Sequence, residues 1–112
     1  MTSQWQCAGA VAALVGATWV ATAAAAAPGM SSAWLSIDVS QEQCVQKGTA
    51  TIRRNGFGSR FEVLANAAIY GERGDYTAMV RCVAEKGIVY FVVAGPDSPA
   101  SGDHMMALRN GF

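Results

Sequence analysis

The residues in this sequence that are best suited to chemistry lie near its carboxyl end. Asp97, Ser98, Ser101, Asp103 and His104 together hold the side chains of a Ser-His-Asp hydrolase. A working triad also needs an oxyanion hole and a turn that presents the nucleophile, and the sequence carries no motif for either. Capping serines and aspartates in the first turn of a helix explain the same residues, so we expect no catalytic site.

His104 and the two methionines after it offer nitrogen and sulfur ligands of the kind that copper prefers. Adjacent side chains on a helix point in different directions, so these three residues cannot hold one ion without Met30 or Met79. We therefore predict that Met105 lies in the core and His104 in solvent. No metal site and no other cofactor are expected.

The segment RRNGFGSR, residues 53–60, combines arginines with an aromatic residue, a composition that can contact phosphate or RNA. The same segment is typical of a helix end, where cations at the negative pole precede a glycine turn. The chain has eight basic and eight acidic residues and hence no net charge. This balance argues against nucleic acid and anionic membranes as partners, and we favour the helix end.

Cys44 and Cys82 are the two cysteines outside the amino-terminal segment. Redox-active cysteines usually occupy a CxxC turn, whereas these two are 38 positions apart. An even number of cysteines in an exported protein indicates a disulfide. Closing the loop between these two cysteines would stabilise the fold by about 4 kcal/mol. We predict a structural Cys44–Cys82 disulfide; two buried free thiols are the alternative for a cytosolic protein.

The amino-terminal segment is free of charge, because every Lys, Arg, Asp and Glu lies at or after Asp38. Residues 7–27 are dominated by alanine, and small residues before Pro28 fit a signal-peptidase site. A retained membrane anchor and a buried helix are the alternatives. We predict that residues 1–27 are a cleaved signal peptide and that residues 28–112 form a periplasmic or secreted domain without a membrane span.

The periodicity of residues 28–112 predicts an α+β fold. Alternating apolar residues indicate strands at 33–39, 61–70, 76–84 and 88–95, and capping residues indicate helices at 41–54 and 99–109. Gly48 would let the first helix approach the sheet closely. The resulting order β-α-β-β-β-α predicts a two-layer sandwich, with a four-stranded, mostly antiparallel sheet and helices on one face.

The strands at 76–84 and 88–95 are the most apolar part of the chain. If Glu85, Lys86 and Gly87 form a three-residue loop, strand alternation assigns one set of side chains to the face away from the helices. This expected interaction surface consists of Met79, Val83, Val89, Phe91 and Val93.

Such a patch should not face water unshielded. We therefore expect a non-enzymatic module for protein interaction or self-association, with a second copy or another envelope protein as its partner. The alternatives are a carrier of a small apolar ligand or metal ion, and a face covered by Trp34 and the segment before it.

Overall fold

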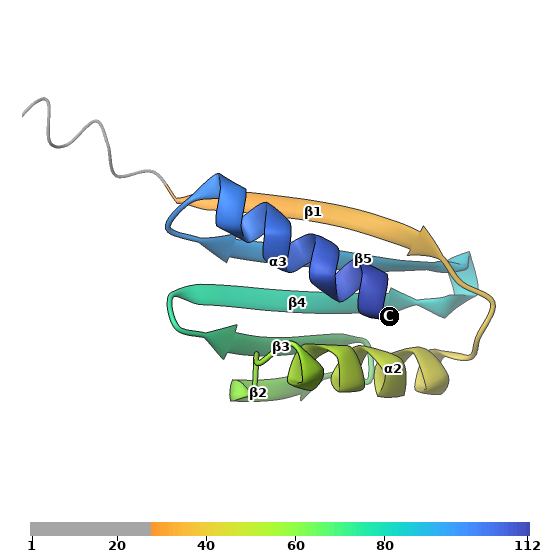
Figure 1. The fold of residues 1–112 in the computed structure, drawn as a ribbon. Helices are drawn as coiled ribbons and strands as arrows, with labels where there is room; N and C mark the ends of the chain where they lie inside the picture. Colours follow the sequence, from red (N-terminus) through yellow and green to blue (C-terminus); the bar gives the residue numbers. More distant parts are fainter. Residues whose placement is uncertain (1–27) are drawn as a thin grey trace, which may run out of the picture.

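The computed structural model describes residues 28–112, in which two helices cover one face of a five-stranded antiparallel sheet (Figure 1). The strands lie in the order β1-β5-β4-β3-β2. Along the chain the elements are β1 (Gly29–Ser36), α2 (Gln41–Arg54), β2 (Ser59–Leu64), β3 (Ala68–Arg73), β4 (Tyr76–Val83), the 3-10 turn η1 (Ala84–Lys86), β5 (Ile88–Gly95) and α3 (Ser98–Gly111). The predicted signal peptide, residues 1–27, lies outside the described residues.

The predicted α+β sandwich is confirmed, and its sheet has one strand more than expected. The segment expected as a single strand at 61–70 forms the hairpin of β2 and β3. Ala65 and Asn66 make its turn with φ of 54° and 50°, and the Ala67 N–H donates to the Leu64 carbonyl over 2.9 Å. Asparagine tolerates this left-handed conformation, which two-residue hairpins require at both central positions.

The β4–β5 hairpin has a different register from the predicted one. Its loop contains four residues, because Ala84 joins Glu85 and Lys86 in η1 before Gly87 closes the turn at φ 69°. Val83 therefore pairs with Ile88, and Cys82 with Val89. Each extra loop residue moves every side chain of the following strand to the other face of the sheet.

Helix α2 packs on β3 and β4 as its sequence predicts. Ser40 and Gln43 form the expected capping box, and Asn55 ends the helix. Cys44, Val45, Gly48 and Ile52 lie on its buried side, together with Thr51. A Cβ added to Gly48 would come within 2.8 Å of the Ile69 side chain, so glycine permits the close approach of helix and sheet.

A disulfide between Cys44 and Cys82 joins α2 to β4, as predicted, with 5.9 Å between the two Cα atoms. Gln41 reinforces this junction from the first turn of α2. Its side-chain amide donates to the Asn66 and Cys82 carbonyls, over 2.9 and 3.0 Å, and its oxygen accepts from the Ala84 N–H over 3.0 Å. One glutamine thus satisfies backbone groups of both loops beside the disulfide.

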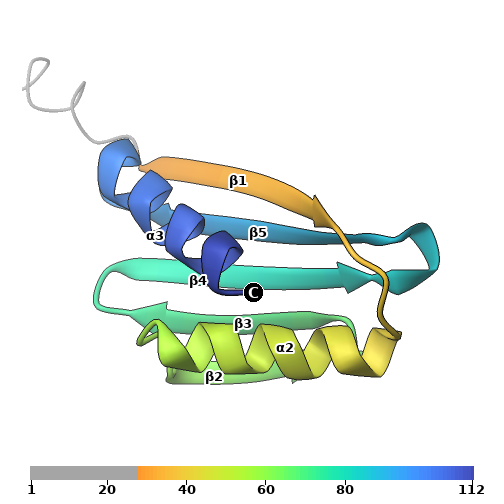
Figure 2. The ribbon, with the colours of Figure 1, turned by 45° about the vertical axis from the view of Figure 1, so that its right-hand side comes forward.

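Helix α3 begins over β1 and β5 and crosses the sheet obliquely toward β4 (Figures 1 and 2). Asp97 caps it by accepting from the Ala100 N–H, and Met105 and Leu108 enter the core as predicted. Phe112 follows the helix and meets the Phe91 ring edge-on at 5.5 Å. Neither helix within residues 28–112 has the length and apolar character to cross a membrane.

The disulfide should contribute measurably to stability. Replacing both Cys44 and Cys82 by alanine is expected to lower the free energy of unfolding by about 4 kcal/mol, because the closed loop restricts the unfolded chain. Urea unfolding of the two proteins checks this value. Reductant should lower the unfolding midpoint of the natural chain and leave that of the variant unchanged; equal midpoints without reductant would contradict the prediction.

Alanine substitutions at Gly58, just before β2, and at Gly71, on the neighbouring strand β3, should change the stability of the fold in opposite directions. A Cβ on Gly71 would fall on the Phe57 carbonyl oxygen, whereas a Cβ on Gly58 meets nothing within 4 Å. We expect Gly71→Ala to destabilise by about 2–3 kcal/mol through overpacking. Gly58→Ala is the matched control, expected to stabilise by about 0.4–1 kcal/mol through the unfolded state. Thermal unfolding measures both, and equal shifts would contradict the placement of Phe57 over β3.

Candidate functional site

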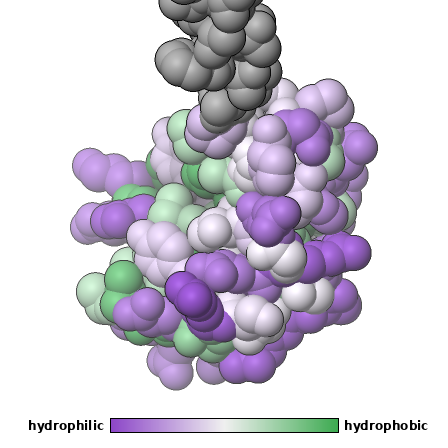
Figure 3. Space-filling model, turned by 90° about the vertical axis from the view of Figure 1, so that its left-hand side faces the viewer, coloured by the Kyte–Doolittle hydropathy of each residue, from purple (hydrophilic) through white to green (hydrophobic). Residues whose placement is uncertain are grey.

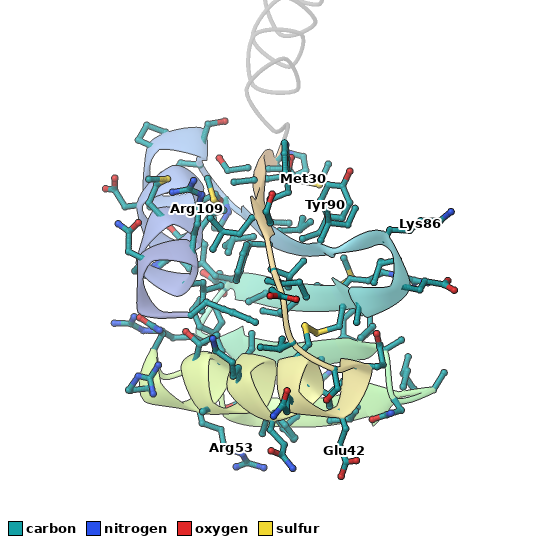
Figure 4. All side chains as sticks on the ribbon, turned by 90° about the vertical axis from the view of Figure 1, so that its right-hand side faces the viewer. Met30, Glu42, Arg53, Lys86, Tyr90 and Arg109 are labelled. Carbon is teal, nitrogen blue, oxygen red and sulfur yellow. A yellow bond between two sulfur atoms is a disulfide. The ribbon has the colours of Figure 1, made fainter. Side chains whose placement is uncertain are left out.

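The face of the sheet away from α2 and α3 carries a band of large apolar side chains. In Figure 4, Tyr90 of β5 and Arg109 of α3 point to opposite sides of the sheet. No element among residues 28–112 covers the Tyr90 side, and we call it the open face. Its largest exposed side chains on β1 and β5 are Met30, Trp34 and Tyr90, which are 71%, 55% and 42% exposed.

Strand register arranges the open face in rows that run across the strands. Trp34 pairs with Tyr90, and Tyr90 pairs with Arg81 on its other side, so an indole, a phenol and a guanidinium lie on three neighbouring strands. The next row contains Val92, Met79 and Tyr70. Cross-strand neighbours on one face lie close enough for their side chains to touch. The open face therefore carries a continuous band of aromatic and aliphatic groups, with the Arg81 guanidinium beside the Tyr90 ring.

The corrected hairpin register changes which predicted residues belong to this surface. Met79 and Val83 lie on the open face, half-buried, as expected. Val89, Phe91 and Val93 do not: all three are 0% exposed and lie under the helices. The prediction was wrong for these three, because it gave the loop three residues in place of four. Their positions on the open face are taken by Ile88, Tyr90 and Val92.

Trp34 belongs to the open face and does not cover it. It lies in β1, whose alternate residues Met30, Ser32, Trp34 and Ser36 face the same side. The alternative of a face covered by Trp34 and the preceding segment is thus wrong for residues 28–34. The sequence analysis did not place Trp34 and Tyr90 together on the open face, although each lies in a strand whose side chains alternate between the two faces.

Charged groups occupy the β2 side of the open face. Arg60 and Glu72 form a solvent-exposed ion pair with 3.7 Å between Nε and Oε1. Together with Glu62 they border an open hollow of about 360 Å³, whose other lining residues are Leu64, Tyr70, Gly71 and Thr77. Exposed ion pairs contribute little to stability. Arg60, Glu62 and Glu72 give the open face a charged border along its β2 side.

The residues that resembled a hydrolase triad are used structurally. Ser101 is buried, and its hydroxyl donates to the Gly29 carbonyl over 3.4 Å. The Asp97 carboxylate accepts from the Ala100 N–H at one oxygen and from the Tyr76 hydroxyl, over 3.0 Å, at the other. Since neither group is hydrogen-bonded to His104, the fold does not bring a triad together.

His104 is half-buried between aromatic rings, where solvent exposure was expected. Its ring centroid lies 4.8 Å from that of Tyr76 and 5.6 Å from that of Phe57. Met105 points into the core while Met106 is exposed, so the three ligands of a copper site diverge. No group of three His, Cys, Asp or Glu side chains within residues 28–112 is placed to hold a metal ion.

The arginines of residues 53–60 are likewise committed to the fold. The Arg53 guanidinium stacks on the Phe61 ring at 3.9 Å, and Arg54 donates to the Gly111 carbonyl over 2.6 Å. Arg54 thereby ties the end of α2 to the end of α3. These contacts support the helix-end interpretation of the segment.

The end of the molecule seen in Figure 3 is mostly hydrophilic, with hydrophobic residues toward its left margin, the side of the open face.

Comparisons with known proteins do not assign a family. No protein-family model matches the chain, and no curated protein matches its sequence. The functional argument therefore depends on the open face itself.

Tyr76 offers a spectroscopic test of the α3 cap. Its hydrogen bond to Asp97 is the main cause that raises its pKa above the ordinary value of 10.0, with smaller contributions from desolvation and from the charges of Asp97 and Asp75. The fold therefore favours the neutral phenol. The stabilisation from the Tyr76–Asp97 hydrogen bond is present below pH 10 and is lost as the pH rises through the folded-state pKa of Tyr76.

We expect Asp97→Asn to shift the ionisation of Tyr76 to lower pH, because an amide oxygen accepts the phenol hydrogen bond less strongly than a carboxylate does and carries no charge. In a Tyr70→Phe/Tyr90→Phe background Tyr76 is the one tyrosine left, and its tyrosinate absorbance can be titrated directly. The same background with Asp97 intact is the control. An unchanged titration midpoint would show that Asp97 does not hold the phenol.

Proposed function

We propose that this protein is a non-enzymatic protein-interaction module that docks through the open face. The observation that carries the proposal is the row of Trp34, Tyr90 and Arg81 on three adjacent strands. Tryptophan, tyrosine and arginine are the residue types that most often dominate the binding energy of protein interfaces. Here they stand side by side on a rigid sheet.

The size of the open face favours a macromolecular partner. Five strands of six to eight residues, at about 4.8 Å between strands and 3.3 Å per residue, span a projected area of about 600 Å². A standard protein interface buries about 800 Å² on each partner. The open face can therefore supply most of one side of a stable interface.

The distribution of polarity over the open face also fits an interface. Its centre on β1, β5 and β4 carries one charged residue, Arg81, among apolar side chains and the small polar residues Ser32, Ser36 and Thr77. Its other charged residues, Arg60, Glu62 and Glu72, lie toward the β2 edge. Interfaces commonly combine a core poor in charge with a polar rim. We infer that the partner presents an apolar surface to β4 and β5, and polar groups opposite β2.

The disulfide supports an oxidising compartment as the place of action. Disulfides such as Cys44–Cys82 persist in the periplasm and outside the cell and are rare in the cytosol. A periplasmic or secreted protein, with a second copy or another envelope protein as partner, is therefore part of the proposal. The Cys44–Cys82 bond would then hold the open face in shape without any cofactor.

The alternative function, a carrier of a small apolar ligand or metal ion, has less support. The interior beneath the helices is filled by Ile52, Phe57, Ile69, Phe91 and Leu108, all 0% exposed. Within residues 28–112 every buried side-chain nitrogen and oxygen atom already has a hydrogen-bond partner. A ligand inside the fold would have to displace packed side chains.

Site-specific photo-crosslinking in the cells that produce the protein tests the proposal. Benzoylphenylalanine at position 79, in the middle of the open face, should give one discrete adduct. The same group at Gln46, on the exposed side of α2, is the matched control and should give none. The adduct mass distinguishes a second copy from a different protein.

Trp34→Ala and Tyr90→Ala should each reduce the position-79 adduct at least tenfold, because truncating such an anchor commonly costs about 2 kcal/mol or more. Equal labelling from positions 79 and 46 would refute docking through the open face. So would a purified monomer that binds no hydrophobic dye.

A further inference from the structure

The two edges of the sheet differ in how they are protected against pairing. The β2 edge carries Arg60 and Glu62, and its register is interrupted between Ser59 and Glu62, where Arg60 has φ 49°. Charges, irregular backbone and short length are the usual means by which proteins prevent a further strand from adding. The β2 edge therefore has the features of a closed end.

The β1 edge has none of these protections. Its eight residues, GMSSAWLS, contain no charge and no proline, and they pair with β5 without a bulge. The Ile37 N–H donates to the Gly87 carbonyl, which continues the β1–β5 register by one residue. Alternation from that bond directs the backbone groups of Met30, Ser32, Trp34 and Ser36 away from β5. Among residues 28–112 no strand pairs with this edge, and α3 lies over the face of the sheet and not along the β1 edge (Figures 1 and 2).

We propose that β1 pairs antiparallel with β1 of a second copy, across a two-fold axis. The sheet is wholly antiparallel, so this addition continues its pattern into a ten-stranded sheet with all four helices on one face. The proposal goes beyond the open-face function, because it uses the backbone edge of β1 and not its side chains.

Backbone geometry limits the register of this pairing. Outward groups belong to even-numbered residues, so an even residue must pair with an even residue of the other copy. A two-fold axis at Ala33 places Ser32 opposite Trp34 and Met30 opposite Ser36, and it uses all four outward residues of each strand. A shift by one residue would pair outward groups with inward ones and lose the hydrogen bonds.

The chemistry of β1 favours a second copy over a different partner. In a two-fold pairing a charged residue near the axis would lie close to the same charge on the other copy, so a charged strand would repel itself. Gly29–Ser36 carries no charge and avoids this penalty. Pairing would also bring two Trp34–Tyr90–Arg81 rows onto one continuous open face, which doubles the surface available to the partner proposed above.

Sedimentation velocity of the protein purified from its producing cells tests the pairing, with Ser32→Pro as the disrupting variant. Proline removes an outward N–H at an edge position where the β1–β5 hydrogen bonds remain intact. Ser32→Thr keeps that N–H and is the matched control. We expect a dimer for the natural chain and Ser32→Thr, and at least a tenfold weaker dimer for Ser32→Pro.

Met79→Lys separates this inference from the proposed function. It places a charge on the open face and leaves the β1 edge unaltered, so the dimer should persist. A dimer lost in Met79→Lys and kept in Ser32→Pro would overturn edge pairing and assign self-association to the open face. A monomer at all concentrations would overturn edge pairing and leave the crosslinking result at position 79 unaffected.

Amide hydrogen exchange gives a second measurement that needs no variant. In the dimer the Ser32 and Trp34 amides should exchange at least tenfold more slowly than in dilute, monomeric protein, because they become hydrogen-bonded. The Ala33 amide points toward β5 and serves as the internal control. Rapid exchange at Ser32 and Trp34 in a dimeric sample would also overturn the proposal.

Discussion

The fold depends on the junction where α2 is held against β3 and β4. The Cys44–Cys82 disulfide fixes the helix to the strand, and Gly48 lets the helix backbone settle onto Ile69 and Val80. Gln41 then binds the ends of both adjacent loops. A domain of this size buries a modest core, so a covalent link at the helix–sheet contact has a large relative effect. With the helices held on one side, the other side of the sheet is left for contact with a partner.

Local sequence chemistry predicted the helices and the disulfide well. Ser40 and Gln43 mark the start of α2 by a capping box, and the buried stripe of α2 repeats with helical spacing. The cysteines could be paired because one lies on that stripe and the other on a strand of the apolar hairpin that the helix covers. Each of these features is decided within a few residues, and tertiary packing reinforces it.

The sheet was less predictable, because its errors arise at turn residues that are neither glycine nor proline: Ala65 and Asn66 in one hairpin and Ala84 in the other. The turn at Ala65 and Asn66 interrupts a regular alternation, so two strands read as one. In the β4–β5 loop, Ala84 looks like a strand residue but belongs to η1. Apolar residues on both faces of β5 then left no contrast to reveal the error. Phe91 and Tyr90 could therefore exchange places in the prediction without any violation of hydrophobic pattern.

The four-residue loop at 84–87 has a consequence for how this gene can change. Substitutions at Ala84, Glu85 or Lys86 alter only solvent-exposed or half-exposed side chains, and the flanking strands keep their alignment. Loss or gain of a single codon would instead turn β5 over, sending Phe91 into water and Tyr90 beneath the helices. The fold therefore restricts the length of this connection more strictly than the identities of Ala84, Glu85 and Lys86, whereas Gly87 is required by its positive φ.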